Sequence, residues 1–203
     1  PVTIGTSGLN RSGTYLNEEW DKRLIGSKGV QILREMSEAS SPLGAALNLW
    51  VAMVLATGWR LDDADESPEA KEMTAFVQSC IDDMEGAFSD TLSDIFSYRP
   101  FGFSLLQHVY KFRQGPGGKV ASKYDDGRIG WRSWSLRAQE TIQEWEFDDE
   151  DRAIAAFQIA PPKYQRVRIP LDACLHFVVR GRKGNPAGIS VMRNSFEPWY
   201  YFK

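Results

Sequence analysis

Few side chains in this sequence have the type and spacing that catalysis requires. Its two histidines, His108 and His176, lie in separate apolar segments, and neither has a second histidine or a cysteine at metal-ligand spacing. The Gly-x-Ser-x-Gly motif of a nucleophile elbow does not occur either. We therefore expect no catalytic residue, no metal ligand and no cofactor-binding residue. A small hydrolase that uses one of the two histidines is kept as an alternative.

Two further runs resemble ligand-binding loops without completing their motifs. A phosphate-binding loop needs a glycine five residues before its Gly-Lys pair and a serine or threonine after the lysine. This sequence has Arg113 before Gly118-Lys119 and Val120 after it. The acidic run 148–151 lacks the alternating ligands and the glycine of an EF-hand loop. We expect both segments to be turns between strands.

Aromatic residues interleaved with arginine form the most distinctive pattern. Trp131, Trp134 and Arg137 lie close together, and Trp145 follows them. Such residues can stack the bases of single-stranded nucleic acid, and they are also enriched at the centres of protein interfaces. We name Trp131, Trp134 and Arg137 as candidate interface residues. A single-stranded nucleic-acid-binding module that stacks bases on Trp131, Trp134 and Trp145 remains the alternative function.

The charge balance favours the protein interface. Lysine and arginine number 24 against 27 aspartates and glutamates, so the formal net charge is −3. A protein that grips nucleic acid over a broad face needs clustered positive charge. The 203 residues, 42% of them hydrophobic, are enough for one or two soluble domains with a core.

Two other features bear on burial and on membranes. Cys80 and Cys174 lie within apolar runs, where we expect small buried side chains. The longest apolar run, residues 45–57, is too short to span a bilayer. We therefore expect a buried helix there and no membrane partner.

Apolar spacing predicts helices in the first half of the chain. Ser41-Pro42 and Ser67-Pro68 each place a capping residue before a proline at the first helical position. Gly86 is expected to divide the long apolar stripe that follows Ser67. The expected elements are an irregular arm over residues 1–17, one or two short helices over 18–39, helices over 41–57 and 67–95, and a short strand over 59–61.

The second half is richer in β-forming residues and turn signals. The expected strands cover residues 103–112, 119–124, 141–147, 153–159, 166–169 and 174–179, and the first four make two hairpins. The tract 184–203, GNPAGISVMRNSFEPWYYFK, has an apolar pattern typical of a helix. The predicted fold class is α+β, with a helical N-terminal half and an antiparallel, β-rich second half closed by a helix.

Several short motifs follow one another in an order shared with a known family. YRPFGFS at 98–104 is similar to a family bend between a helix and a strand, and Leu136–Phe147 is similar to a family hairpin. The longest match runs from IPLD (169–172) through GNPAGISVMR (184–193) to WYYFK (199–203). Together these tracts resemble the portal proteins of tailed bacteriophages, closest to the Mu-type branch, over residues 36–203.

The resemblance implies a domain layout and further candidate residues. Residues 1–40 would form an arm with short helices, and residues 41–203 a wing-like α+β region that stops where a helix leads to stem, clip and crown. Gly188 would allow a tight start of that helix. Arg193 offers a forked donor for a carboxylate on a neighbour, and Trp199 and Tyr200 offer flat packing area. These last three complete the candidate interface residues.

The resemblance also implies a function without catalysis. Portal proteins form a homododecameric ring at one capsid vertex of the virion, assembled in the host cytoplasm. Double-stranded DNA passes through the ring, without sequence specificity, during packaging and ejection. The terminase large subunit, head-tail adaptors and capsid or scaffold proteins are the expected partners. No enzyme activity, cofactor or membrane contact is expected.

Overall fold

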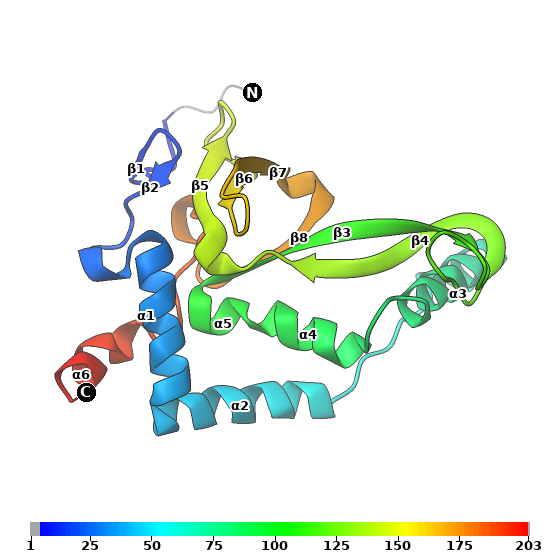
Figure 1. The fold of residues 1–203 in the computed structure, drawn as a ribbon, viewed down its shortest axis with the longest axis horizontal. Coiled ribbons are helices and arrows are strands. Elements are labelled where there is room, and N and C mark those ends of the chain that lie inside the picture. The colour runs from blue at the N-terminus through cyan, green and yellow to red at the C-terminus, as the bar shows by residue number, and fades with distance from the viewer. Residues whose placement is uncertain (1–4, 203) are drawn as a thin grey trace.

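The computed structural model describes residues 5–202 and has an α+β architecture (Figure 1). The predicted fold class is confirmed, with a helical first half, antiparallel sheets in the second half and a short helix at the end. The helices are α1 (Gly26–Ala39), α2 (Ser41–Ala56), α3 (Pro68–Asp82), α4 (Phe88–Phe96), α5 (Tyr98–Phe101) and α6 (Phe196–Tyr201). The strands are β1 (Arg11–Ser12), β2 (Tyr15–Leu16), β3 (Phe103–Gln114), β4 (Asp125–Leu136), β5 (Ile142–Phe147), β6 (Ala153–Ile159), β7 (Arg166–Pro170) and β8 (Cys174–Val178).

The helix boundaries follow local sequence signals. Ser67 caps α3 as predicted, because its hydroxyl accepts a hydrogen bond from the Ala70 amide at 3.2 Å. The predicted division of the long stripe is confirmed, since Gly86 adopts a φ of +83° between α3 and α4. At α2 the cap is Ser40, one residue before the predicted Ser41, and its side chain makes no capping hydrogen bond.

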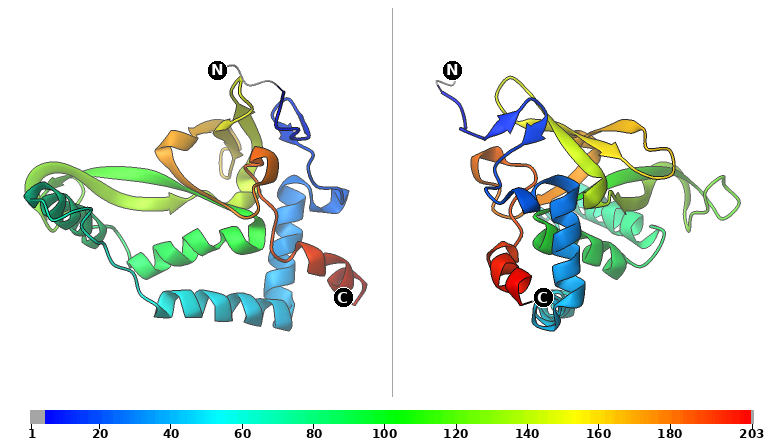
Figure 2. Two further views of the ribbon diagram at one scale, coloured as in Figure 1. Left: turned by 180° about the vertical axis from the view of Figure 1, so that it is seen from behind. Right: turned by 60° about the vertical axis from the view of Figure 1, so that its left-hand side comes forward.

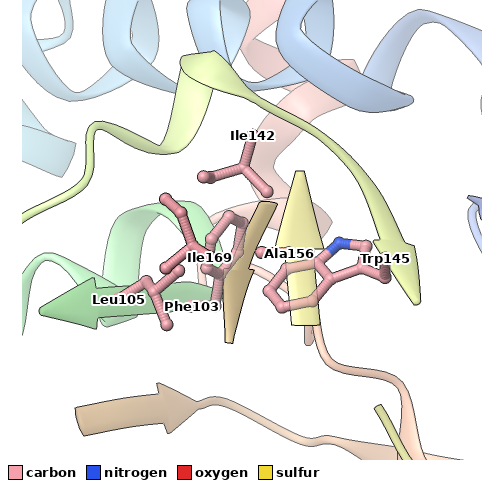
Figure 3. Packing of buried hydrophobic residues seen from close by; sticks show 6 residues of the cluster. All are labelled: Phe103, Leu105, Ile142, Trp145, Ala156 and Ile169. Carbon is pink, nitrogen blue, oxygen red and sulfur yellow. The ribbon is translucent and has the colours of Figure 1, made fainter. Parts of the chain in front are cut away.

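Two three-stranded antiparallel sheets share one core. One sheet has the order β4-β3-β8 and the other the order β5-β6-β7, while β1 and β2 form a separate small hairpin. Phe103 and Leu105 of β3 pack with Trp145, Ala156 and Ile169 of the other sheet, as Figure 3 shows. The core therefore lies where β3 begins, and the far end of the β3–β4 ribbon extends beyond it (Figure 1).

Three predicted elements differ from the structure. The return strand of the first hairpin is Asp125–Leu136, because hydrogen bonds from Ser122 and Lys123 to Asp83 hold the preceding residues in a loop. Residues 59–61 form no regular element and pair with no described strand. The tract expected to be helical is largely irregular over its described residues 184–202, with a 3-10 turn, and only residues 196–201 form an α-helix.

Buried charges hold the β3–β4 ribbon against α3. Lys111 Nζ lies 3.0 Å from Asp83 Oδ2, and each side chain is only 2% exposed. Burial raises the pKa of Asp83, but hydrogen bonds from the Lys123 amide, Ser122 and Lys111 outweigh it and keep this pKa below its usual value. Arg113 is buried on the same face of β3. Because an unpaired buried charge is strongly destabilising, this cluster fixes which face of the ribbon meets α3.

The backbones at Gly102 and Gly188 are in direct contact. Both glycines have positive φ, +96° and +58°. Val179 N donates to Gly102 O at 2.8 Å, and Ile189 N donates to Val179 O at 2.8 Å. A Cβ at position 188 would lie 2.3 Å from Gly102 O. Gly188 therefore allows a close contact between the start of β3 and the C-terminal segment. The sequence had suggested a different role, a tight start of a helix.

Replacing Gly188 by alanine is expected to destabilise the fold by more than about 3 kcal/mol, because steric overlap adds to the strain of positive φ. Gly127→Ala is the matched control, since Gly127 has a φ of +67° and nothing within 4 Å of its Cβ position. Strain alone should cost this control about 1–2 kcal/mol. Urea unfolding followed by circular dichroism measures both losses, and equal losses would contradict the close contact.

Glu144 anchors the N-terminal hairpin to β5. It accepts hydrogen bonds from Thr14 Oγ1 at 2.7 Å and from Arg166 Nη2 at 2.9 Å. The Arg166 hydrogen bonds, followed by the one from Thr14, lower the pKa of Glu144 to about 2. Because the folded pKa lies below the unfolded value of 4.5, this stabilisation is present above that pH and is lost as the pH falls towards 2.

Glu144→Gln is expected to lower the free energy of unfolding at neutral pH and to flatten its pH dependence, since an amide gains nothing from ionisation. Urea titrations at about pH 7, 5, 4 and 3 would follow this change through tryptophan fluorescence. Glu38→Gln, at an exposed position of α1, is the control and should behave like the unaltered chain. An undiminished loss of stability between about pH 5 and 3 in Glu144→Gln would show that another group causes it.

Candidate functional site

One face of the β3–β4 ribbon carries exposed aromatic and apolar side chains. Tyr110 and Phe112 of β3 are 59% and 61% exposed, and Ile129, which pairs with Phe112, is 56% exposed. Trp131 pairs with Tyr110 and is half-buried beside it. Directly opposed residues in neighbouring strands share a face. These four side chains therefore form one surface, called the ribbon face below.

Trp134 and His108 continue this surface along the two strands. The rings of Trp131 and Trp134 meet edge to face at 5.1 Å, and the His108 ring stacks 6.4 Å from that of Trp131. Burial lowers the pKa of His108, so its ring is neutral near pH 7 and packs like an aromatic side chain. The structure thus brings together the predicted residues Trp131 and Trp134.

Helix α2 is partly exposed along its whole length, which corrects the prediction of a buried helix. None of its residues is buried and none is charged. Trp50 covers α4, where its ring lies 5.1 Å from that of Phe96. Leu49 and Met53 are 63% and 62% exposed. The exposed side of the helix, called the α2 surface below, includes Ala45, Asn48, Leu49, Ala52, Met53 and Ala56.

The α2 surface and the ribbon face lie on different layers of the chain. Figure 1 shows α4 and α5 between α2 and the β3–β4 ribbon, and both views in Figure 2 show the same order. Helix α4 contacts both α2 and β3. Lys111 of β3 is buried towards α3, and Tyr110 and Phe112, which alternate with it, therefore point away from α3. At the other end of this surface, the ring of Trp134 lies 5.8 Å from that of Phe88 in α4.

The candidate residues Trp199 and Tyr200 lie on α6, near the start of α2. Tyr200 is 48% exposed, and the Arg23 guanidinium lies 4.7 Å from the centre of its ring. Trp199 lines a groove of about 480 Å³ between α6 and the first residues of α2. Phe202 lines the same groove and is 91% exposed. The aromatic side chains of α6 therefore border the uncharged helix α2.

The two candidate arginines are bonded within the chain. Arg137 Nε and Nη2 donate to Gln107 Oε1 at 2.9 and 2.5 Å. Arg193 Nε donates to Glu19 Oε2 at 2.8 Å, and its guanidinium lies 4.4 Å from the centre of the Trp20 ring. The carboxylate bound by Arg193 thus comes from the N-terminal segment of the same chain. Contact of either arginine with another subunit stays a prediction.

The structure separates the tryptophans that the base-stacking alternative groups together. Trp145 is 4% exposed and stacks 5.2 Å from His176 in the core, so no base can reach it. His176 Nε2 lies 2.8 Å from Pro186 O, and burial lowers the pKa of His176. Within residues 5–202, neither His176 nor His108 is hydrogen-bonded to a hydroxyl, a thiol or a carboxylate. Both histidines pack against tryptophan rings.

Cysteines, metal ligands and apolar helices give no further site. Cys80 and Cys174 are free thiols, of which Cys80 is buried as predicted and Cys174 is half-buried. Among the described residues, no three histidine, cysteine, aspartate or glutamate side chains are grouped so that they could hold a metal ion. No single described helix has the length and apolar composition to cross a membrane, although α1 and α2 meet this criterion together across an 89° bend.

The most exposed residues of the two surfaces were not singled out from the sequence. Two signals were available. Residues 108, 110 and 112 are aromatic and alternate with the basic residues 111 and 113, the pattern of a strand with two different faces. Residues 41–57 contain no charge at all, which is typical both of a core helix and of a helix at a subunit contact.

Comparison with known proteins gives a family match over most of the chain. The model of the family described as the portal protein of Mu bacteriophage matches residues 30–203. The matched region begins within α1 and includes α2, the β3–β4 ribbon and α6. A search of the curated proteins found no significant match.

Proposed function

The chain belongs to the family of the Mu bacteriophage portal protein, and from this membership we propose that it is one subunit of a portal ring at a capsid vertex. The ring is a homododecamer whose channel passes double-stranded DNA during packaging and ejection. The terminase large subunit, head-tail adaptors and capsid or scaffold proteins dock on it. The subunit works by assembly and electrostatics, and the proposal assigns it no catalytic step.

The observation that carries this proposal is the pair of separate exposed apolar surfaces, the α2 surface and the ribbon face. A ring needs a heterologous interface, in which one patch of each subunit binds a different patch of the next. Exposed apolar patches mark sites of interaction. We propose that the α2 surface of one subunit packs on the ribbon face of its neighbour, where the small side chains of α2 allow close approach to the aromatic rings of β3 and β4.

The charge of the chain is compatible with a channel wall. The formal net charge is −3, so the chain as a whole repels a polyanion weakly instead of binding it. Clustered basic residues on such a wall would hold DNA with strong, salt-dependent affinity and would slow its passage. A mildly acidic subunit is therefore suited to DNA that has to slide.

The ring is tested by light scattering and negative-stain imaging of the gene product in its full encoded length. We expect particles of about twelve subunits with a central hole. Leu49→Glu/Met53→Glu, and separately Phe112→Glu, are expected to yield folded monomers, because each places a carboxylate in a desolvated apolar contact. Circular dichroism checks that the folds are intact.

Met73→Glu is the matched control. Met73 is 69% exposed on α3 and belongs to neither surface, so this variant should assemble like the unaltered protein. If the unaltered protein and Leu49→Glu/Met53→Glu form rings equally well, the proposed interface is contradicted. The proposal that the protein forms a ring would still hold. A compact monomer of the unaltered protein at all concentrations would contradict the ring itself.

A further inference from the structure

A half-open cleft of about 630 Å³ lies on a different part of the chain from the two apolar surfaces. Its walls come from the N-terminal segment with the start of α1, from β5 with the core, and from the loop that follows β8. This volume lies within the range of about 300–1,000 Å³ that is usual for ligand pockets. No residue of the ribbon face or of the α2 surface lines it, although the candidate interface residue Arg193 does.

The cleft is basic, although the whole chain is acidic. Four basic and two acidic side chains line it. Both acidic ones have partners within the chain, since Glu18 accepts from Lys183 Nζ at 3.2 Å and Glu19 from Arg193 Nε at 2.8 Å. Arg180 and Arg182 are exposed and form no side-chain hydrogen bond or ion pair with the described residues. The charge left over in the cleft is therefore positive.

Two further features present hydrogen-bond donors to the cleft. Helix α1 starts here with Gly26, Ser27 and Lys28, and its cap residue Ile25 provides no side-chain hydrogen bond to the free amides of the first turn. Arg193 lines the cleft and is only 9% exposed, and its Nη2 is buried without a hydrogen-bond partner. A buried guanidinium nitrogen with no partner is unusual, and an anionic group in the cleft would satisfy it.

Exposed aromatic side chains also line the cleft. Tyr15 and Trp20 are 56% and 73% exposed, whereas Phe103, Ile142 and Trp145 of the core (Figure 3) close the cleft and are almost fully buried. Strand β5 is an edge strand of its sheet, and Ile142 and Gln143 line the cleft at that edge. Free strand edges are places where an extended peptide can add to a sheet.

We propose that this basic cleft binds an extended segment of another protein in which apolar side chains alternate with carboxylates. Its apolar side chains pack on the exposed rings of Tyr15 and Trp20, and its carboxylates meet Arg180, Arg182, Arg193 and the first amides of α1. The exposed acidic runs of the chain itself, residues 62–66 and 148–151, contain no large apolar side chain and do not fit. The site does not depend on ring formation.

A peptide fits this cleft better than DNA does. A duplex would offer only phosphates to the basic side chains and would leave the exposed rings of Tyr15 and Trp20 uncovered. Phosphate contacts fix the position of a duplex without using such apolar area. DNA binding is therefore treated as an outcome that the test must distinguish.

The test uses fluorescein-labelled hexapeptides and fluorescence anisotropy. The alternating peptide (Leu-Asp)₃ is expected to bind saturably, and (Leu-Lys)₃ and (Ser-Asp)₃ at least about tenfold more weakly, because each lacks one of the two required features. Arg180→Glu/Arg182→Glu should weaken binding of (Leu-Asp)₃ by at least about tenfold. Hydrogen exchange of the complex should show protection at residues 24–28 and 180–190.

Lys71→Glu/Lys119→Glu is the matched control. It makes the same change in net charge at exposed positions on α3 and on the loop of the ribbon, and should bind (Leu-Asp)₃ within about twofold of the unaltered protein. Equal weakening by both double variants, or no binding of (Leu-Asp)₃ up to about 1 mM, would overturn the proposal. So would equally effective competition by inorganic phosphate or by a short DNA duplex, since either would indicate an anion site without peptide preference.

Discussion

The close contact between the Gly102 and Gly188 backbones is the constraint on which the rest of the fold depends. Because no Cβ fits between them, the end of α5 and the segment after β8 meet through backbone hydrogen bonds alone. Strand β3 starts at the next residue and pairs with both β4 and β8. The position of β3 therefore sets the shared core, the direction of the ribbon and the wall of the basic cleft formed by residues 180–193.

A second constraint decides which side of the ribbon faces outwards. Asp83 and Lys111 are both almost fully buried. If the ribbon turned so that one of the two side chains became exposed, the other would remain as an unpaired buried charge, which is strongly destabilising. The strand alternates, so burying Lys111 necessarily exposes Tyr110 and Phe112. An electrostatic contact on one face of the ribbon thus creates the aromatic surface on the other, which is the surface that we assign to subunit contact.

The sequence was informative where local chemistry determines structure. The cap at Ser67, the division at Gly86 and the hairpin of β5 and β6 follow from neighbouring residues and were predicted correctly, as was the α+β class. For the first hairpin, strand β3 was predicted but its partner strand was placed too early in the chain. The prediction that α2 is buried was wrong. A helix covered by its own chain and a helix covered by another subunit have the same uncharged sequence pattern, so the sequence does not distinguish them. The contacts of Arg193 and the cleft join residues far apart in sequence, and no local pattern indicates them. The division of the chain at residue 40 stays a prediction.

The basic cleft is built from both ends of the described chain, and this has a consequence for the order of folding. Glu18 and Glu19 are bonded to Lys183 and Arg193, at sequence separations of 165 and 174 residues. Contacts of such separation form late, because the entropy of closing a long loop has to be overcome first. During synthesis the cleft is therefore absent until nearly all of this region has left the ribosome. A ligand that recognises the cleft consequently distinguishes a finished subunit from a partly made one.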